Sequence, residues 1–181
     1  GGSAVAGRLA QAGKSVCLLE AGGRNNGMLV KTPGFMPFLR DAQNYRFETV
    51  PQKGLNGRVG YQPRGRGLGG SSAINAMIYI RGNRWDYDQW AELGCTGWSH
   101  DDVLPYFRKQ ETDVDFDGPL HGADGPMAVR RIFADRWPGF TRGFIQAAQE
   151  DGWHDIGDNN AVFGDGYFPI AVANSDGRRT S

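Results

Sequence analysis

The sequence predicts an α/β fold of the Rossmann-like, dinucleotide-binding type, and two observations support this prediction. First, residues 3–12 have small residues on one helical face, and a glycine and an apolar run of strand length, 15–20, come next. A helix, a short turn and a buried strand form half of a βαβ unit. Second, an acidic residue about 20 positions after the glycines binds the ribose hydroxyls in such folds. Gly2 and Glu20 have this spacing, although Glu20 could equally cap an ordinary strand.

Further elements are indicated by periodicity and by helix stop signals. Residues 21–66 are rich in Gly, Pro and Asn, which predicts an irregular excursion with short elements. The strand that would precede the first helix is missing, so the chain reads as truncated at its start, and it stops soon after its last turn. The other predicted elements are a helix at 84–93 closing at Gly94, a helix at 99–111 with Ser99 as N-cap and with Pro105 as a kink or a start, a strand at 127–132, a helix at 138–151 ending at Gly152, a strand at 166–173 and a turn at 174–177.

Composition excludes several classes of protein. Lys+Arg and Asp+Glu are equal at 20 each in 181 residues, so neither nucleic acid nor an anionic membrane is expected as a partner. No apolar stretch approaches the ~20 residues that cross a bilayer, so no membrane segment is predicted. Cys17 and Cys95 are too few for a disulfide framework. They indicate a reducing, cytoplasmic location, with both thiols buried or inert.

A glycine- and serine-rich loop at 65–72 precedes the apolar run 73–80, which predicts a buried helix. Gly65 and Gly70 have the spacing of a Walker A loop, but Ser71 stands in place of the lysine, which excludes a phosphate-binding NTPase. Backbone N–H groups and serine hydroxyls ahead of a helix would still suit an anion such as a dinucleotide pyrophosphate. Asn75 on this helix needs a partner, which is either backbone or the polar rim of a planar heteroaromatic ring.

The remaining polar residues have structural interpretations. His100, His121 and His154 are interpreted as structural or solvated, and none is assigned a catalytic role. The acidic run 113–117 lacks the glycine and final glutamate of a calcium loop, so it predicts an acidic surface loop and no metal site. The pairs Arg130–Arg131 and Arg178–Arg179 predict solvated faces, whereas Arg66, inside the glycine loop, is a candidate to contact a pyrophosphate.

Two stretches closely resemble the glucose-methanol-choline (GMC) oxidoreductases, which are FAD-dependent enzymes that oxidise alcohols. They are 20–23 (EAGG) and 63–82 (PRGRGLGGSSAINAMIYIRG). Further similar segments occur in the family's order at 86–90, 97–109 and 121–126. The resemblance covers essentially the whole chain, and the choline- and aryl-alcohol-oxidising branch looks nearest.

The resemblance implies a set of FAD-binding residues. Gly2 would be the last glycine of the FAD fingerprint, and Glu20 would hold the adenosine ribose. Ile74 stands where some members carry the histidine that binds FAD covalently, which implies non-covalent FAD. The family's catalytic His, with its His or Asn partner, lies beyond the end of this chain. The implied cofactor-binding residues are Gly2, Glu20, Ala21, Arg66, Gly67, Gly69, Gly70, Ser71, Ser72, Asn75, Ala76, Met77 and Ile78.

The function that the resemblance implies is an FAD-dependent oxidoreductase acting on the CH–OH group of a small alcohol, with hydride transfer to flavin N5. Oxygen, a quinone or another carrier would then take the electrons. Residues 1–155 would form a partial FAD-binding domain, and 156–181 the truncated start of an α+β substrate-binding domain, so that this portion alone would be inactive. The alternative is a Rossmann-like domain that binds NAD(P) or another adenine nucleotide without flavin, but such a domain has no need of a second glycine-serine loop.

Overall fold

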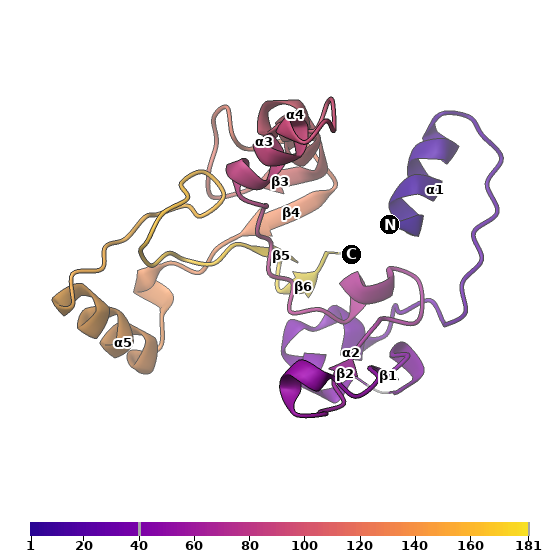
Figure 1. The fold of residues 1–181 in the computed structure, drawn as a ribbon, viewed down its shortest axis with the longest axis horizontal. Helices are drawn as coiled ribbons and strands as arrows, with labels where there is room; N and C mark the ends of the chain where they lie inside the picture. The colour runs from indigo at the N-terminus through magenta and orange to yellow at the C-terminus, as the bar shows by residue number, and fades with distance from the viewer. Residues whose placement is uncertain (40, 181) are drawn as a thin grey trace. The chain divides into compact units, whose positions relative to one another are not determined.

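The computed structural model describes residues 1–39 and 41–180 (Figure 1). They form two compact units. The first unit contains Gly1–Ala76 and Gly177–Arg179, and the second contains Met77–Asp176 and Thr180. No helix among these described residues is both long and apolar enough to cross a bilayer.

The first unit opens with the predicted helix, α1 (Gly2–Gln11), which ends as Gly13 takes a positive φ of 74°. Figure 1 draws the connection after α1 as coil. The prediction of a strand at 15–20 is therefore wrong, since no described residue supplies the backbone partners that a strand requires. Cys17, which the sequence predicts to be buried or inert, is exposed for the same reason, and no residue of α1 is buried either.

The rest of the first unit is irregular, as the sequence predicts for 21–66. Its short elements are held by backbone bonds and turns, and its buried apolar residues are Val30 and Ala73. The strands β1 and β2 pair antiparallel, with Phe47 opposite Gln62. The elements are α2 (Met28–Lys31), β1 (Phe47–Glu48), β2 (Tyr61–Gln62), β6 (Arg178–Arg179) and the 3₁₀ turns Pro33–Phe38, Asp41–Gln43, Lys53–Leu55 and Gly70–Ala73.

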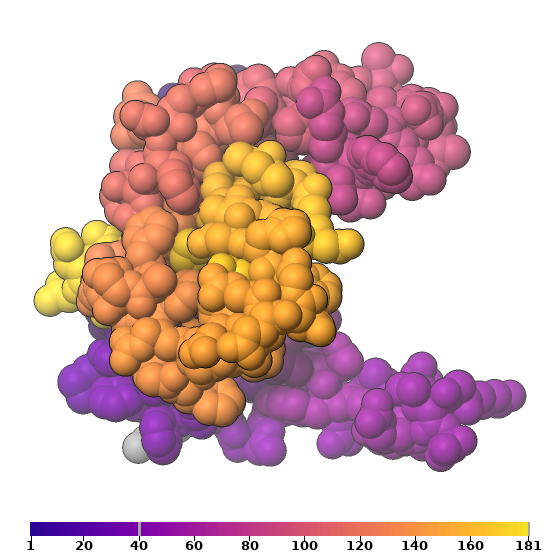
Figure 2. Space-filling view, turned by 90° about the vertical axis from the view of Figure 1, so that its left-hand side faces the viewer, coloured from indigo at the N-terminus to yellow at the C-terminus, as the bar shows by residue number. Residues whose placement is uncertain are grey.

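The second unit contains the three remaining predicted helices. They are α3 (Arg84–Glu92), α4 (His100–Gln110) and α5 (Gly139–Glu150). Ser99 caps α4 in a capping box with Asp102, because each side chain accepts a hydrogen bond from the other residue's backbone N–H. Pro105 lies inside α4 and does not begin it. On α5, coloured orange in Figures 1 and 2, Phe140 and Phe144 are 87% and 66% exposed.

A small sheet organises the second unit. Its strands are β3 (Glu111–Asp113), β4 (Met127–Arg130) and β5 (Val172–Ser175). β3 is parallel to β4, β4 is antiparallel to β5, and Val129 lies opposite Asp113 on one side and Ala173 on the other. Val129, Ala171 and Ala173 are the buried apolar residues of this unit. The 3₁₀ turn Ala134–Arg136 lies between β4 and α5.

Two boundaries differ from the sequence-based prediction. The strand predicted at 166–173 begins only at Val172, after Pro169, which lacks a backbone N–H donor. The turn predicted at 174–177 is tighter, because only Asp176 and Gly177 have positive φ, as in a two-residue turn, and β5 runs on to Ser175.

The apolar run 73–80 is not the predicted helix. In the first unit, the 3₁₀ turn Gly70–Ala73 ends at Ile74. In the second unit, Met77 has a positive φ of 62°, and Ile78 forms an isolated bridge with Val172. Tyr79 N donates to Ala171 O at 2.8 Å, and Ala173 N donates to Met77 O at 2.8 Å. A short apolar run suits a strand as well as a helix, and here the backbone partners near β5 decide between them.

Candidate functional site

The glycine loop and the Glu20 carboxylate lie side by side in the first unit. Glu20 Oε1 accepts hydrogen bonds from Gly22 N at 2.8 Å and from Gly67 N at 2.9 Å. Leu68 N donates to Gly23 O at 2.9 Å, which joins the two segments a second time. The acidic residue and the loop, 47 residues apart in sequence, therefore meet, as a dinucleotide site requires.

Glycine is required where these segments cross. A Cβ on Gly22 would overlap the backbone of Arg66 and Gly67, and one on Gly65 would overlap the backbone of Gly70. Gly67 has φ of 129°, and a Cβ there would overlap the Asn25 side chain. The glycines thus allow backbone to approach backbone.

The polar groups of the loop are mostly used to hold its shape. Gly65 N donates to Ser71 Oγ at 3.1 Å, and Ser72 Oγ donates to Gly69 O at 2.7 Å. The prediction of exposed N–H groups and hydroxyls ahead of a helix is corrected accordingly, since the loop leads into a four-residue 3₁₀ turn. Arg66 is exposed, and its guanidinium lies 5.9 Å from the Tyr45 ring centroid.

Asn75 lies just beyond the loop and is exposed. Its Oδ1 accepts a hydrogen bond of 2.7 Å from Nη1 of Arg179. The sequence predicts a solvated Arg178–Arg179 pair, but only Arg178 is exposed, and Arg179 is buried with 7% exposure. Consecutive strand residues point to opposite faces, which explains the difference and is the signal that sequence reasoning missed.

The positions of the other predicted cofactor residues say less about a cofactor site. Gly2 opens α1, and no atom among the described residues lies within 4 Å of a Cβ built on it. Ala21 and Ala76 are exposed. Met77 and Ile78 belong to the second unit, where Ile78 is 51% exposed.

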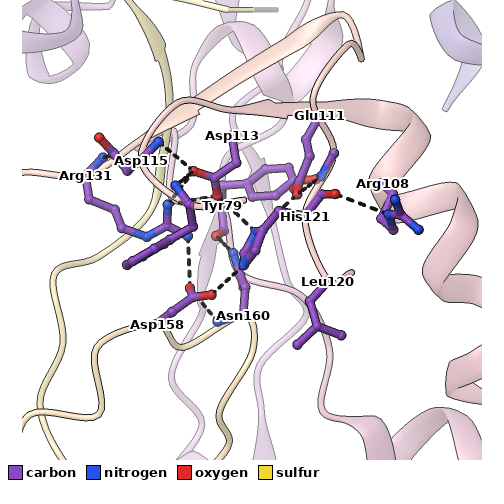
Figure 3. Close-up of polar contacts among 12 residues, drawn as sticks. Tyr79, Arg108, Glu111, Asp113, Asp115, Leu120, His121, Arg131, Asp158 and Asn160 are labelled. Carbon is purple, nitrogen blue, oxygen red and sulfur yellow. Dashed lines mark hydrogen bonds and ion pairs between the residues drawn. The ribbon is translucent and has the colours of Figure 1, made fainter. Parts of the chain in front are cut away.

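A second concentration of polar groups is buried in the second unit, and we name it the His121 cluster (Figure 3). It joins three cations to three carboxylates from β3, from the end of β4 and from the loops beside them. Its members are Arg81, Glu111, Asp113, His121, Arg131 and Asp158. Arg81 pairs with Glu111 at 2.5 Å, and Arg131 pairs with Asp113 at 2.8 Å and with Asp158 at 2.9 Å.

His121 completes the charge balance of this cluster. Its Nδ1 lies 3.2 Å from Asp113 Oδ2, and its Nε2 lies 2.8 Å from Asp158 Oδ2. An imidazolium carries a proton on each ring nitrogen, so a carboxylate beside each nitrogen favours the charged form of His121. Asp113 first and then Asp158 raise the pKa of His121 to about 10. Burial alone would raise the pKa of Asp113, but His121 and Arg131 hold that pKa below its usual range.

These contacts correct two predictions and support a third. The sequence predicts a solvated Arg131, but this residue is 2% exposed, because Asp113 and Asp158 compensate its charge. Asp113, placed by the sequence in an acidic surface loop, is buried, although Asp115 and Asp117 are exposed. The structural interpretation of His121 agrees with its position between carboxylates.

The His121 cluster also offers three potential metal ligands. Ligand atoms of Glu111, Asp113 and His121 lie within 4.8 Å of one another. A divalent cation there would have to displace the proton of His121 and share the space with two guanidinium groups that already neutralise the carboxylates. Charge balance therefore favours a structural ion-pair network.

The network fixes the segment that carries Met77 and Ile78. Arg81 N donates to Asn160 Oδ1 at 2.9 Å, and Asn160 Nδ2 donates to Tyr79 O at 3.1 Å. Arg81 Nη1 donates to Leu120 O at 2.6 Å. The backbone on both sides of Ile80 is thus held by the buried Asn160 side chain.

The mixed α/β fold and the glycine loop bound to an acidic residue define a class, the nucleotide-binding α/β proteins. Within that class the chain can be placed in a family. A model of the family described as GMC oxidoreductase matches residues 3–181, and the chain belongs to this family.

Curated relatives agree with this assignment. The oxygen-dependent choline dehydrogenase of Photobacterium profundum is 36% identical over 183 residues, which cover 99% of this chain and 32% of that protein. The protein of the same name from Rhizobium rhizogenes is 39% identical, with 99% and 33% coverage. The chain therefore spans about a third of the length of these relatives.

Solved structures share the fold. Pyridoxine 4-oxidase from Mesorbium loti superposes with a TM-score of 0.87 at 32% identity, over 98% of this chain and 35% of that one. An FAD-dependent oxidoreductase from Chaetomium thermophilum gives a TM-score of 0.85 at 31% identity, over 97% and 32%. The predicted α/β, Rossmann-like fold class is confirmed by these neighbours.

Proposed function

We propose that the complete protein containing this chain is an FAD-dependent oxidoreductase acting on the CH–OH group of a small alcohol. The observation that carries the proposal is the junction of Glu20 with Gly67, 2.9 Å between Oε1 and N, in a chain that matches the GMC family from residue 3 to residue 181. The names of the relatives, which include choline dehydrogenases and pyridoxine 4-oxidase, support an alcohol as donor.

The residues of the first unit fit FAD by their chemistry. Glu20 carries a carboxylate for the ribose hydroxyls at an exposed position, and Asn75 carries an exposed amide for the ring system. The glycines between them allow close approach of the cofactor's diphosphate. Ile74 has no nucleophilic atom, so the attachment would be non-covalent. The proposed contacts are Gly2, Glu20, Ala21, Arg66, Gly67, Gly69, Gly70, Ser71, Ser72, Asn75 and Ala76.

When bound, FAD would supply the hydride acceptor. The role of this chain is then to bind and orient the cofactor. His121 is locked between Asp113 and Asp158 and is not available to take the proton of an alcohol. We therefore propose that the proton acceptor is the family's catalytic histidine, outside residues 1–181.

Three finer points are part of the same proposal. Residues 1–155 would belong to the FAD-binding domain, and residues 156–181 would begin the substrate-binding domain. Oxygen or a quinone-type carrier would take the electrons. A reducing, cytoplasmic location is supported by Cys17 and Cys95, which are both exposed and unpaired.

Purification of the complete polypeptide that contains residues 1–181 tests the proposal. We expect a yellow protein that releases FAD on denaturation and whose flavin absorbance bleaches when an alcohol is added without oxygen. Glu20→Ala should lose FAD, whereas Glu48→Ala, an exposed glutamate of the same unit, should retain it. A colourless protein that binds NAD(P) would support the flavin-free alternative and overturn the proposal.

A further inference from the structure

The exposed apolar residues of α5 lie on one side of the helix. Phe140, Phe144 and Ala147 are four and three positions apart, a spacing that makes them neighbours on a helix surface, and all three are exposed. The exposed fractions of Phe140 and Phe144 are 87% and 66%. Two phenylalanine rings in water on the same side of a helix form an apolar patch, and such patches on soluble proteins mark interaction surfaces.

A groove beside this patch has walls that are joined to each other. Its volume is about 580 Å³, and Phe144 and Tyr167 are among the residues that line it. The backbone of Tyr167 is held in place, because its N–H donates to His154 O and its carbonyl accepts from Ile156 N, both at 3.0 Å. Gln149 of α5 donates a hydrogen bond to the Tyr167 hydroxyl. The groove is therefore a formed feature of the second unit, with α5 as one wall and the segment at Tyr167 as the other.

The charges near the groove favour an apolar protein segment as its occupant. Among the described residues that line the groove, Asp151 alone is charged. A nucleic acid or an anionic lipid surface would require cations, and α5 itself carries only Arg142, which Glu150 balances. An apolar segment fits the aromatic walls if it also turns hydrogen-bond donors toward the Asp151 carboxylate, which only accepts.

We propose that the apolar patch of α5 and the groove beside it bind an apolar segment of the same polypeptide from outside residues 1–181. The curated relatives match 99% of this chain with about a third of their own length, so a complete polypeptide of similar size is about three times as long. A segment of the same polypeptide has an effective concentration that a separate protein rarely reaches, which favours it as the occupant. The inference goes beyond the proposed function, because no residue of the proposed cofactor site takes part in it.

Cysteine labelling of the complete polypeptide makes the first test. Ala147→Cys places a thiol on the patch, whereas Gln146→Cys places one on α5 about 200° around the helix from Phe144. We expect maleimide to react about tenfold or more slowly at Ala147→Cys, because the covering segment must open first. Each site is followed by mass spectrometry, since Cys17 and Cys95 are exposed as well. A thiol at Ala147→Cys that reacts as fast as the one at Gln146→Cys would overturn the inference.

A photo-cross-link identifies what covers the patch. p-Benzoylphenylalanine in place of Phe144 keeps the aromatic ring and reacts with C–H bonds beside it. We expect cross-linked peptides from outside residues 1–181 of the same polypeptide, and far fewer when the probe replaces Gln146. Cross-links to residues 1–76, or between heavy- and light-isotope copies in a mixed sample, would mean that the first unit or a second copy covers the patch, and either result would overturn the inference.

A charged substitution tests the same contact through stability. Phe144→Asp places a carboxylate under the covering segment without a cation, so the unfolding midpoint of the complete polypeptide should fall clearly. Gln146→Asp should leave the midpoint unchanged. An unchanged midpoint for Phe144→Asp would mean that Phe144 lies in water, and it would overturn the inference. A folded wild type that is colourless would overturn the proposed function, whereas the labelling and cross-linking results would still support this inference.

Discussion

The His121 cluster and the glycine loop differ in whether their polar side chains are buried or exposed. In the cluster, six charged side chains are buried and cancel one another, and they hold backbone from β3, β4 and the loops beside them. In the loop, backbone is held mainly by backbone, and Glu20 and Asn75 remain exposed. The comparison indicates that side-chain charge is used for rigidity in one region, while polar side chains remain exposed in the other.

The largest expected effect comes from unbalancing the cluster. Arg131→Met leaves the buried carboxylate of Asp113 without its cation, and removal of one partner from a buried pair costs about 3–5 kcal/mol. The complete polypeptide should unfold at a clearly lower temperature in a calorimetric scan. Arg130→Met is the matched control, because Arg130 is only half-buried and forms no ion pair among the described residues. Equal midpoints for the two variants would show that the cluster is not stabilising.

The second effect is a pH dependence from His121. Its pKa is raised from 6.5 to about 10 in the folded protein, so its stabilising contribution is complete below pH 6.5 and is lost as the pH rises to about 10. We expect the unfolding midpoint to fall over this range. His121→Gln should remove this part of the profile, and His154→Gln, at an exposed position, should retain it. A profile that is the same in all three proteins would refute the imidazolium assignment.

A smaller effect tests the loop itself. Gly67→Ala forces a residue with a Cβ into φ of 129° and against Asn25, which predicts a cost of roughly 1–3 kcal/mol. The displaced loop should also bind FAD less tightly, measured as the flavin-to-protein absorbance ratio after gel filtration. Gly54→Ala, where no atom lies within 4 Å of the new Cβ, should match the wild type. If Gly67→Ala matched the wild type too, close backbone approach would not be what the loop requires.

The smallest effect concerns the start of α4, which lies outside both the His121 cluster and the glycine loop. Ser99→Ala removes the cap of α4, which predicts a loss of about 1 kcal/mol. Ser99→Asn should restore most of it, since asparagine caps equally well. Thermal unfolding of the two variants gives the comparison, and no difference between them would mean that the capping box contributes nothing measurable.

The parts of the fold that were predictable are those with local causes. The helices α3, α4 and α5 are set by stop glycines and by caps such as Ser99, which act within a few residues. The meeting of Glu20 with the glycine loop was also predictable, because a dinucleotide site requires an acidic residue beside such a loop.

The predictions that were wrong share a cause, which is that they depend on contacts between residues far apart in the sequence. Residues 15–20 have the composition of a buried strand, but strand formation depends on a neighbour that the described residues do not supply. The burial of Arg131 depends on Asp158, 27 residues away, and the burial of Arg179 depends on Val30, 149 residues away. The partners of both contacts are too far apart in the sequence for any local pattern to reveal them.

The bonds of Glu20 have a consequence for how the glycine loop would respond to a ligand. One carboxylate oxygen holds the amide hydrogens of Gly22 and Gly67, so a sugar hydroxyl arriving at that carboxylate would compete with the protein's own turn. Binding of a ligand at Glu20 and ordering of the glycine loop would then be coupled. Deuterium uptake at the Gly67 amide would then report whether a nucleotide is bound at Glu20, even in a protein that shows no turnover.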